Sequence, residues 1–193
     1  MRTSIIFAAA IVLLASCAKP ADPVREAIKG EIMGNMSQGF TSVEVTSVEK
    51  IDSTTFRTEL GRRRKAFETK RDVDSDYLVK YMTEGKKRNA ELKSESYRKD
   101  LLILNGLDSL EVALSAILDD VAYYDYRFCA SARGDGMKMQ FRDAFVSITP
   151  DGRVISMTAD QRDLHKSAGR VIPGYLELVQ GAGEDDEDTE VIL

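Results

Sequence analysis

The sequence predicts an α+β protein: a helix packed on an antiparallel sheet of about four strands, with a C-terminal three-stranded meander and an added helical excursion. Three observations lead to this prediction. Residues 40–51 are rich in β-branched side chains, and apolar residues recur at helical spacing between 53 and 121. Short alternating segments separated by turn motifs then follow from 121 to 158.

The first helix is predicted to begin at Asp22-Pro23, with the aspartate as N-cap and the proline at the first helical position. Apolar residues then recur on every fourth position and share one helix face: Val24, Ile28, Ile32 and Met36. Gly39 ends this unit. The β-branched segment 40–51 follows as a strand, and its alternation slips between Val45 and Val48, which indicates a bulge or a change of face.

Residues 53–104 form a charged and mostly helical excursion. Phe56, Leu60 and Phe67 keep a helical spacing, and Asp74 is positioned to cap a second helix. Apolar residues almost vanish between 86 and 100, which indicates a solvated excursion or a projecting hairpin because such a helix has little surface to pack.

The strongest predicted helix starts after a break at Asn105-Gly106. Asp108 and Glu111 have the spacing of a capping box, with aspartate in place of the usual serine or threonine. A continuous apolar stripe follows, so this helix is expected to lie on the core. The stripe consists of Leu107, Leu110, Leu114, Ile117, Leu118 and Val121.

The C-terminal third predicts the meander and its register. If Ala132 opposes Met137 across the turn at 134–136, then Phe128 opposes Phe141, and both apolar faces coincide. A type I turn at 149–152, with proline second and glycine fourth, leads to a returning strand at 154–158. A loop and a short helix at 173–179 follow.

The N-terminus carries the most specific motif. One basic residue, Arg2, precedes an apolar run from Ile5 to Leu14 that is too short to span a bilayer as a permanent helix. Small residues and a cysteine come next, in the order Leu14-Ala15-Ser16-Cys17. This order indicates a secretory signal. The alternative is an ordinary secretory signal whose apolar run happens to end at a cysteine.

The Leu-Ala-Ser-Cys segment resembles the lipobox of bacterial lipoproteins. The resemblance implies that residues 1–16 are a signal peptide that is removed and that Cys17 is lipidated, for example with palmitate. Residues 17–21 would then be a lipidated tether, 22–180 a single domain, and 181–193 a disordered acidic tail. Because Ala18 is not aspartate, the resemblance also implies an outer-membrane position facing the periplasm, with an envelope protein as a possible partner.

A second resemblance concerns the fold. The order of elements is similar to that of the cystatin-like and NTF2-like α+β folds, in which a helix lies across an antiparallel sheet. Element order alone carries no function with it.

Composition excludes several function classes. The formal net charge is −5, and six acids fall within residues 184–190, so the remaining chain is close to neutral. We therefore expect no nucleic-acid partner. The chain has one histidine and two cysteines, which removes most metal sites, and we expect no cofactor and no metal ligands. With Cys17 lipidated, Cys129 has no disulfide partner.

One set of residues is a candidate pocket: Tyr124, Tyr126, Asp143 and His165. In the predicted register Asp143 lies across from Tyr126 on the apolar face, where a carboxylate must be hydrogen-bonded or have a raised pKa. The alternative is that Asp143 lies near a bulge and faces solvent, since Ala144, Val146 and Ile148 indicate that the apolar face switches after it. The sequence pattern favours this alternative.

Three further features have simpler interpretations. Asp160, Asp163 and His165 offer metal-ligand atoms but match no known spacing, so a polar loop is expected. Cys129 is expected to be a structural thiol that pairs with Gln140. The basic runs 62–65 and 86–88 are expected to be solvated helix faces.

These observations favour a membrane-anchored envelope lipoprotein that acts as a non-catalytic binding or assembly module. No paired nucleophile and base, metal spacing or phosphate loop is visible. The alternative is a small hydrolase or isomerase with a carboxylate in a sheet pocket, because acidic residues are plentiful and carboxylate-only chemistry needs no histidine.

Overall fold

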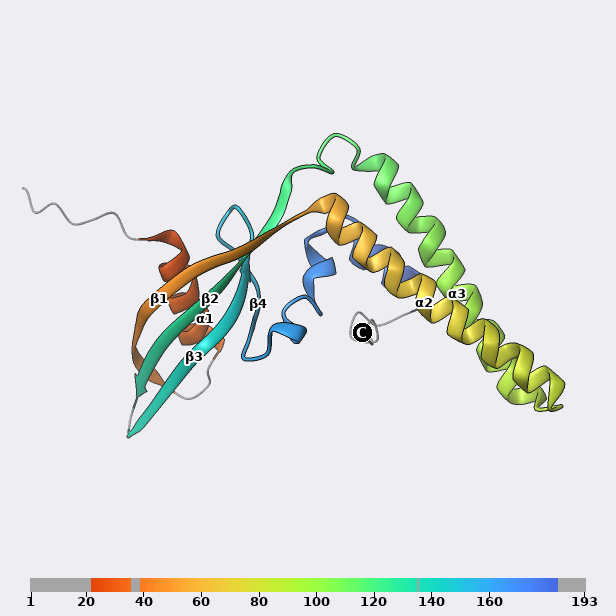
Figure 1. The fold of residues 1–193 in the computed structure, drawn as a ribbon, viewed down its shortest axis with the longest axis horizontal. Coiled ribbons are helices and arrows are strands. Elements are labelled where there is room, and N and C mark those ends of the chain that lie inside the picture. Colours follow the sequence, from red (N-terminus) through yellow and green to blue (C-terminus); the bar gives the residue numbers. More distant parts are fainter. Residues whose placement is uncertain (1–21, 36–38, 135, 184–193) are drawn as a thin grey trace, which may run out of the picture.

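A computed structural model describes residues 22–35, 39–134 and 136–183 and confirms the α+β class. Four antiparallel strands form one sheet in the order β1-β2-β3-β4. A long helical hairpin projects away from one end of the sheet (Figure 1). The predicted signal peptide 1–16, the tether 17–21, Met36 and most of the acidic tail lie outside the described residues.

The elements follow each other with short connections. The strands are β1 (Phe40–Thr55), β2 (Val121–Gly134), β3 (Met137–Ile148) and β4 (Val154–Thr158). The helices are α1 (Pro23–Asn35), α2 (Phe56–Thr83), α3 (Lys87–Ala113) and α4 (Tyr175–Gly181), with two short 3₁₀ turns before α4.

The first core lies between α1 and the sheet. Ile28 and Ile32, on the predicted apolar face of α1, are fully buried against strand residues such as Phe128 and Val146. The helix that covers the sheet is therefore α1. The predicted covering helix after Asn105 instead belongs to the hairpin, where Leu107 packs in a second core.

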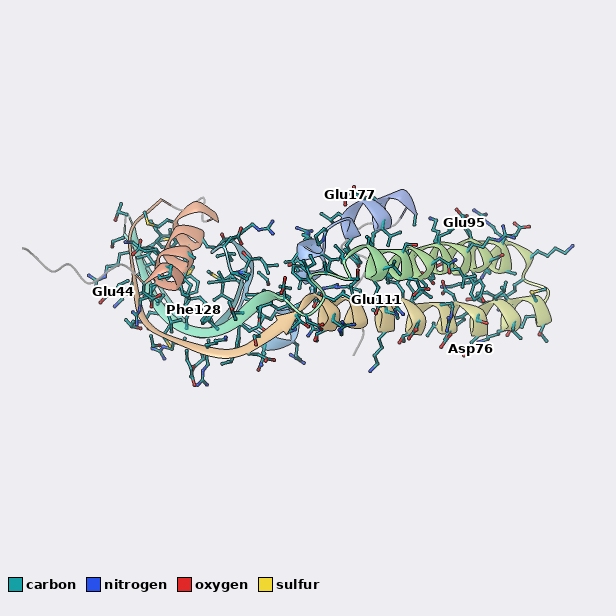
Figure 2. All side chains as sticks on the ribbon, turned by 90° about the horizontal axis from the view of Figure 1, so that it is seen from above. Glu44, Asp76, Glu95, Glu111, Phe128 and Glu177 are labelled. Atoms are coloured by element: carbon teal, nitrogen blue, oxygen red, sulfur yellow. The ribbon has the colours of Figure 1, made fainter. Side chains whose placement is uncertain are left out.

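The second core lies at the base of the hairpin. Leu60 and Phe67 of α2 pack there with Ile103 and Leu107 of α3, together with Tyr175 of α4. The two clusters share no residue, because each is built by a different set of helices. The molecule is thus a helix-covered sheet joined end-on to a helical hairpin (Figure 2).

Two predicted helix boundaries inside the hairpin are wrong. Asp74 lies within the continuous helix α2, and α3 runs through Asn105-Gly106 to Ala113. Gly106 is a packing contact: a Cβ there would lie 2.1 Å from Cδ1 of Leu178, so a larger residue would force the Leu178 side chain of α4 to move. Residues 114–120 form turns, and Leu118 packs into the second core from them.

The predicted meander is present, but its register is wrong. Gly134 opposes Met137, which leaves two residues in the turn, and Ala130 opposes Phe141. Phe128 pairs with Ala144, although its ring still lies 6.2 Å from the ring of Phe141. The predicted pairing of Ala132 with Met137 leaves four residues between the two strands instead of two, and this difference moves the pairs next to the turn by two residues.

A bulge in β3 accounts for the rest of the difference. The register shifts between Phe128 and Ala130, opposite Arg142 and Asp143. Asp143 has φ of 49°, a left-handed conformation that aspartate tolerates better than most residues. The apolar face then moves to Ala144 and Val146, as the alternative interpretation of the sequence expected.

Both edges of the sheet discourage strand addition. β1 is long, but its pairing with β2 is interrupted by four register shifts, including the predicted one near Val45. Exposed charged residues such as Glu44, Glu49 and Lys50 lie along it. β4 is only five residues long. Bulges, charges and short length are the devices by which natural edge strands avoid aggregation.

The C-terminal region follows the prediction in outline. The turn at 149–152 is closed by the Gly152 N–H donating to the Thr149 carbonyl at 2.9 Å. The final helix is two residues later than predicted, so α4 includes Gly181, which had been assigned to the tail. In the described part of the chain, no helix is both long and apolar enough to cross a membrane.

We expect Phe128→Ala to lower the free energy of unfolding by about 3–5 kcal/mol, because the ring is fully buried between α1 and the sheet. Phe141→Ala serves as the matched control, and its effect should be smaller since that ring is only partly buried. Urea denaturation measures both. Equal losses for the two variants would contradict the packing described here.

Candidate functional site at the junction of sheet and hairpin

A buried ion pair marks the junction between the hairpin and the rest of the molecule. Glu59 and Arg63 lie one turn apart near the start of α2, and both side chains are completely buried. The Arg63 Nε donates to Glu59 Oε1 at 2.7 Å. This helix begins with a capped turn, in which the Thr55 hydroxyl accepts from the Thr58 N–H. The cap satisfies one of the free backbone N–H groups at the start of α2.

Arg63 also holds the C-terminal segment. Its two terminal nitrogens donate to the backbone carbonyls of His165, at 2.6 Å, and Lys166, at 3.2 Å. Gly169 makes room for this arrangement, because a Cβ there would lie 3.0 Å from Arg63 Nε and 2.5 Å from the Tyr175 ring. A buried guanidinium therefore has partners for its donors on three sides.

The second oxygen of Glu59 is satisfied from the sheet. The Tyr123 hydroxyl of β2 donates to it at 2.8 Å, and the Arg62 guanidinium donates to it as well. Burial and the nearby charge of Glu59 raise the pKa of Tyr123 well above its usual value, so the phenol keeps its proton. The hydroxyl acts as a hydrogen-bond donor here, and the geometry does not equip it as a base.

A second carboxylate lies beside this pair. Asp125 of β2 is buried, accepts from the Ser147 hydroxyl at 2.6 Å, and lies 2.8 Å from His165 Nε2. The three residue types match those of a serine hydrolase triad, but the connectivity does not. Both Ser147 and His165 bind the carboxylate, whereas a nucleophilic serine must donate to the histidine. The arrangement joins β2, β3 and the C-terminal turns.

The structure does not bring the four predicted pocket residues together. Tyr126 pairs across from Val146, so the predicted opposition of Tyr126 and Asp143 is wrong. Asp143 is exposed at the bulge, and His165 faces Asp125. Tyr124 and Tyr126 are half-buried neighbours whose ring centroids lie 6.4 Å apart.

Cys129 lies beside the bulge. It pairs with Ser47 of β1, and Gln140, its predicted partner, pairs instead with Ser131. The backbone N–H of Asp143 donates to its sulfur at 3.5 Å. This N–H and the Ser47 side chain hold the pKa of the thiol below its usual value. The single histidine of the chain, His165, binds Asp125 instead.

The predicted polar loop contains the first 3₁₀ turn, Gln161–Asp163, and is held by internal ion pairs. Asp160 accepts from Arg162, which lowers the pKa of Asp160 to about 2, and Asp163 pairs with Lys166 at 3.3 Å. Within residues 22–35, 39–134 and 136–183, no group of three or more His, Cys, Asp or Glu side chains is placed to hold a metal ion.

The basic run 62–65 departs from the predicted solvated face. Arg63 is buried, Arg62 reaches Tyr123, and Arg64 pairs with Asp108 and Glu111 of α3. The sequence contained a signal for this: Glu59 precedes Arg63 by four residues, the spacing of a helical ion pair. Burial of that pair could not be predicted, because it depends on α4 and the turns before it.

Two cavities adjoin these elements. One, of about 570 Å³, opens at the junction, and the other, of about 550 Å³, lies between α1 and the β3–β4 edge. Asp143 lines neither of them. The junction cavity is lined by Phe56, Asp120, Val121, Ala122, Tyr124, Thr149, Pro150, Asp151, Arg153 and Val171.

Comparisons with protein-family models, with curated proteins and with solved structures found no match.

We expect Glu59→Gln to lower the free energy of unfolding by about 3–5 kcal/mol, because it leaves the buried Arg63 without a counter-charge. Arg57→Ala on the same helix is the control. Its partner Asp119 is exposed, so solvent screens that pair and the unfolding midpoint should barely move. Urea denaturation distinguishes the two, and equal effects would show that the buried pair has no special role.

We also expect Cys129 to be alkylated by iodoacetamide with a pH midpoint below that of an unperturbed thiol, roughly 8.5. The folded chain lacking residues 1–17 has Cys129 as its one thiol. A lowered pKa places the thiolate at lower pH, so the rate should rise earlier than in the same chain in urea, where the hydrogen bonds are lost. Identical profiles would contradict the contact with Asp143.

Proposed function

We propose that this protein is a lipid-anchored lipoprotein of the bacterial cell envelope that acts as a non-catalytic binding or assembly module. Lipidation of Cys17, an outer-membrane position facing the periplasm and an envelope protein partner are all parts of this proposal. The support for the anchor is the Leu14-Ala15-Ser16-Cys17 motif, and the support for a binding role comes from the hairpin.

The observation that carries the binding role is the distribution of exposed apolar side chains. Ten large hydrophobic residues are exposed in the described chain, and seven of them lie on α2 and α3. They are Val73, Tyr77, Val79, Met82, Leu92, Leu102 and Val112. Exposed apolar patches mark protein-interaction surfaces, and the concentration of these residues on one projecting element makes the hairpin the candidate for such a surface.

The last turns of α2 are the part of the hairpin best suited to a partner. Val79 and Met82 are 63% and 68% exposed, respectively, and lie far from both hydrophobic cores. On another face of the same turns, Tyr77 and Tyr81 lie with ring centroids 5.8 Å apart, and Lys80 and Lys86 approach these rings. Tyrosine and methionine side chains are enriched at the core of protein interfaces, and tyrosine is enriched in hot spots.

A second candidate function is a small hydrolase or isomerase. The observation in its favour is the junction cavity, whose lining includes Asp120, Asp151 and Tyr124. Two carboxylates can supply an acid and a base without histidine. A screen of the purified chain against glycoside, ester and peptide substrates tests it, and turnover that is lost in Asp120→Asn would favour this second function.

We expect Cys17→Ala to abolish incorporation of labelled palmitate, because the cysteine thiol is the proposed acceptor. Cys129→Ala is the matched control and should keep the label. Metabolic labelling of cells followed by fractionation measures both. Wild-type protein found free in the periplasm without an acyl group would contradict the anchor.

We expect a photo-crosslinking side chain at Met82 to capture one envelope protein in living cells. Position Met137, which is 45% exposed on the sheet, is the control and should capture nothing discrete. Mass spectrometry should identify the same protein from position Val79. Equal capture from the sheet and from α2 would contradict a binding surface on the hairpin.

A further inference from the structure

Three contacts show that α4 runs along the outer face of α3 toward the tip of the hairpin. Gly174, just before α4, approaches Leu110, and Leu178 in its middle packs against Gly106. After its end, the Gly183 carbonyl accepts from Lys99 Nζ at 3.3 Å. Residues 174, 178 and 183 contact residues 110, 106 and 99 of α3, respectively. The residue numbers rise in one segment and fall in the other, so the two segments are antiparallel.

The chain therefore leaves Gly183 in the direction of the tip. Figure 2 shows Glu177 of α4 above α3, with Glu95 farther out along the same helix. The seven residues 184–190 that follow Gly183 include six acids. Extended, they span about 23 Å. The stretch of α3 from Lys99 to its start at Lys87 measures about 18 Å, so the acidic run is long enough to cover it.

The charges on that stretch of α3 are complementary to the acidic run. Lys87, Arg88, Arg98 and Lys99 form no ion pair within the described part of the chain. Glu91 and Glu95 lie on the same stretch, so the four basic residues leave it with a net positive charge that faces six negative ones. Leu92, 60% exposed, lies between them and offers an apolar contact.

We propose that the acidic segment 184–190 docks on the outer face of α3 between Lys99 and Lys87, within the same molecule. The direction of α4, the length of the segment and the opposite charges carry this inference. It does not depend on the proposed function. Docking there covers α3 and leaves Val79 and Met82 of α2 open to a partner.

Zero-length carbodiimide crosslinking tests the contact, because it joins a carboxylate to an amine only when the two touch. Monomeric protein with the tail docked should give crosslinks from residues 184–190 to Lys99 and Lys87, and 0.5 M salt, at which charges are screened within about 4 Å, should suppress them. Lys29 and Lys138 on the sheet half are the control amines and should give none. Tail crosslinks to the control amines, or none to α3, would overturn the proposal.

Lysine acetylation gives an independent readout. A chain ending at Gly183 should be acetylated several-fold faster at Lys87 and Lys99 than the full chain, with Lys29 and Lys138 unchanged. Mixing isotope-labelled and unlabelled chains separates contacts within one molecule from contacts between two. Crosslinks only between labelled and unlabelled copies would show that the second copy, not the chain itself, supplies the acidic segment, and would overturn the intramolecular docking.

Discussion

The buried pair of Glu59 and Arg63 is the constraint on which the molecule depends. Its two side chains bind α2 to β2 through Tyr123 and to the C-terminal turns through the carbonyls of His165 and Lys166. An ion pair in a low-dielectric site gains little over an apolar replacement, but each partner alone would be an uncompensated charge. The pair therefore specifies how three segments meet more than it adds to stability.

Ion pairs also specify how α2 and α3 meet along the outer part of the hairpin. Near the base, α2 and α3 meet through apolar side chains such as Phe67 and Ile103. Farther out the seam becomes ionic: Asp74 pairs with Lys93, and Asp100 lies 3.4 Å from Lys70. A seam of this kind sets which residues face each other, yet buries little apolar surface. It leaves the apolar side chains of the outer turns in solvent, where the proposed partner surface lies.

The sheet half is held together by apolar packing. The cluster between α1 and the strands is made of apolar side chains. The edge strands of the sheet resist the addition of another strand because β1 is bulged and charged and β4 is short. The bulge at Asp143 shows how local geometry shapes the candidate site. One left-handed residue turns the Asp143 carboxylate to solvent, brings its N–H to Cys129, and moves the apolar face to Ala144. The predicted pocket disappears as a result.

The sequence by itself determined the α+β class, the helix from Asp22-Pro23, the antiparallel strands and the turn at Thr149-Pro150, because periodicity, caps and turn residues are local signals. Register and helix continuity were decided by the tertiary structure. A two-residue turn and a bulge moved the strand pairs, and α4 packing on Gly106 turned an apparent break into a contact point. The site residues come from two distant segments, Glu59 with Arg63 on α2 and Tyr123 with Asp125 on β2, and their burial depends on all of these elements meeting at once. No local pattern encodes such a meeting, since the free energy of a buried charge depends on partners that only the assembled fold supplies.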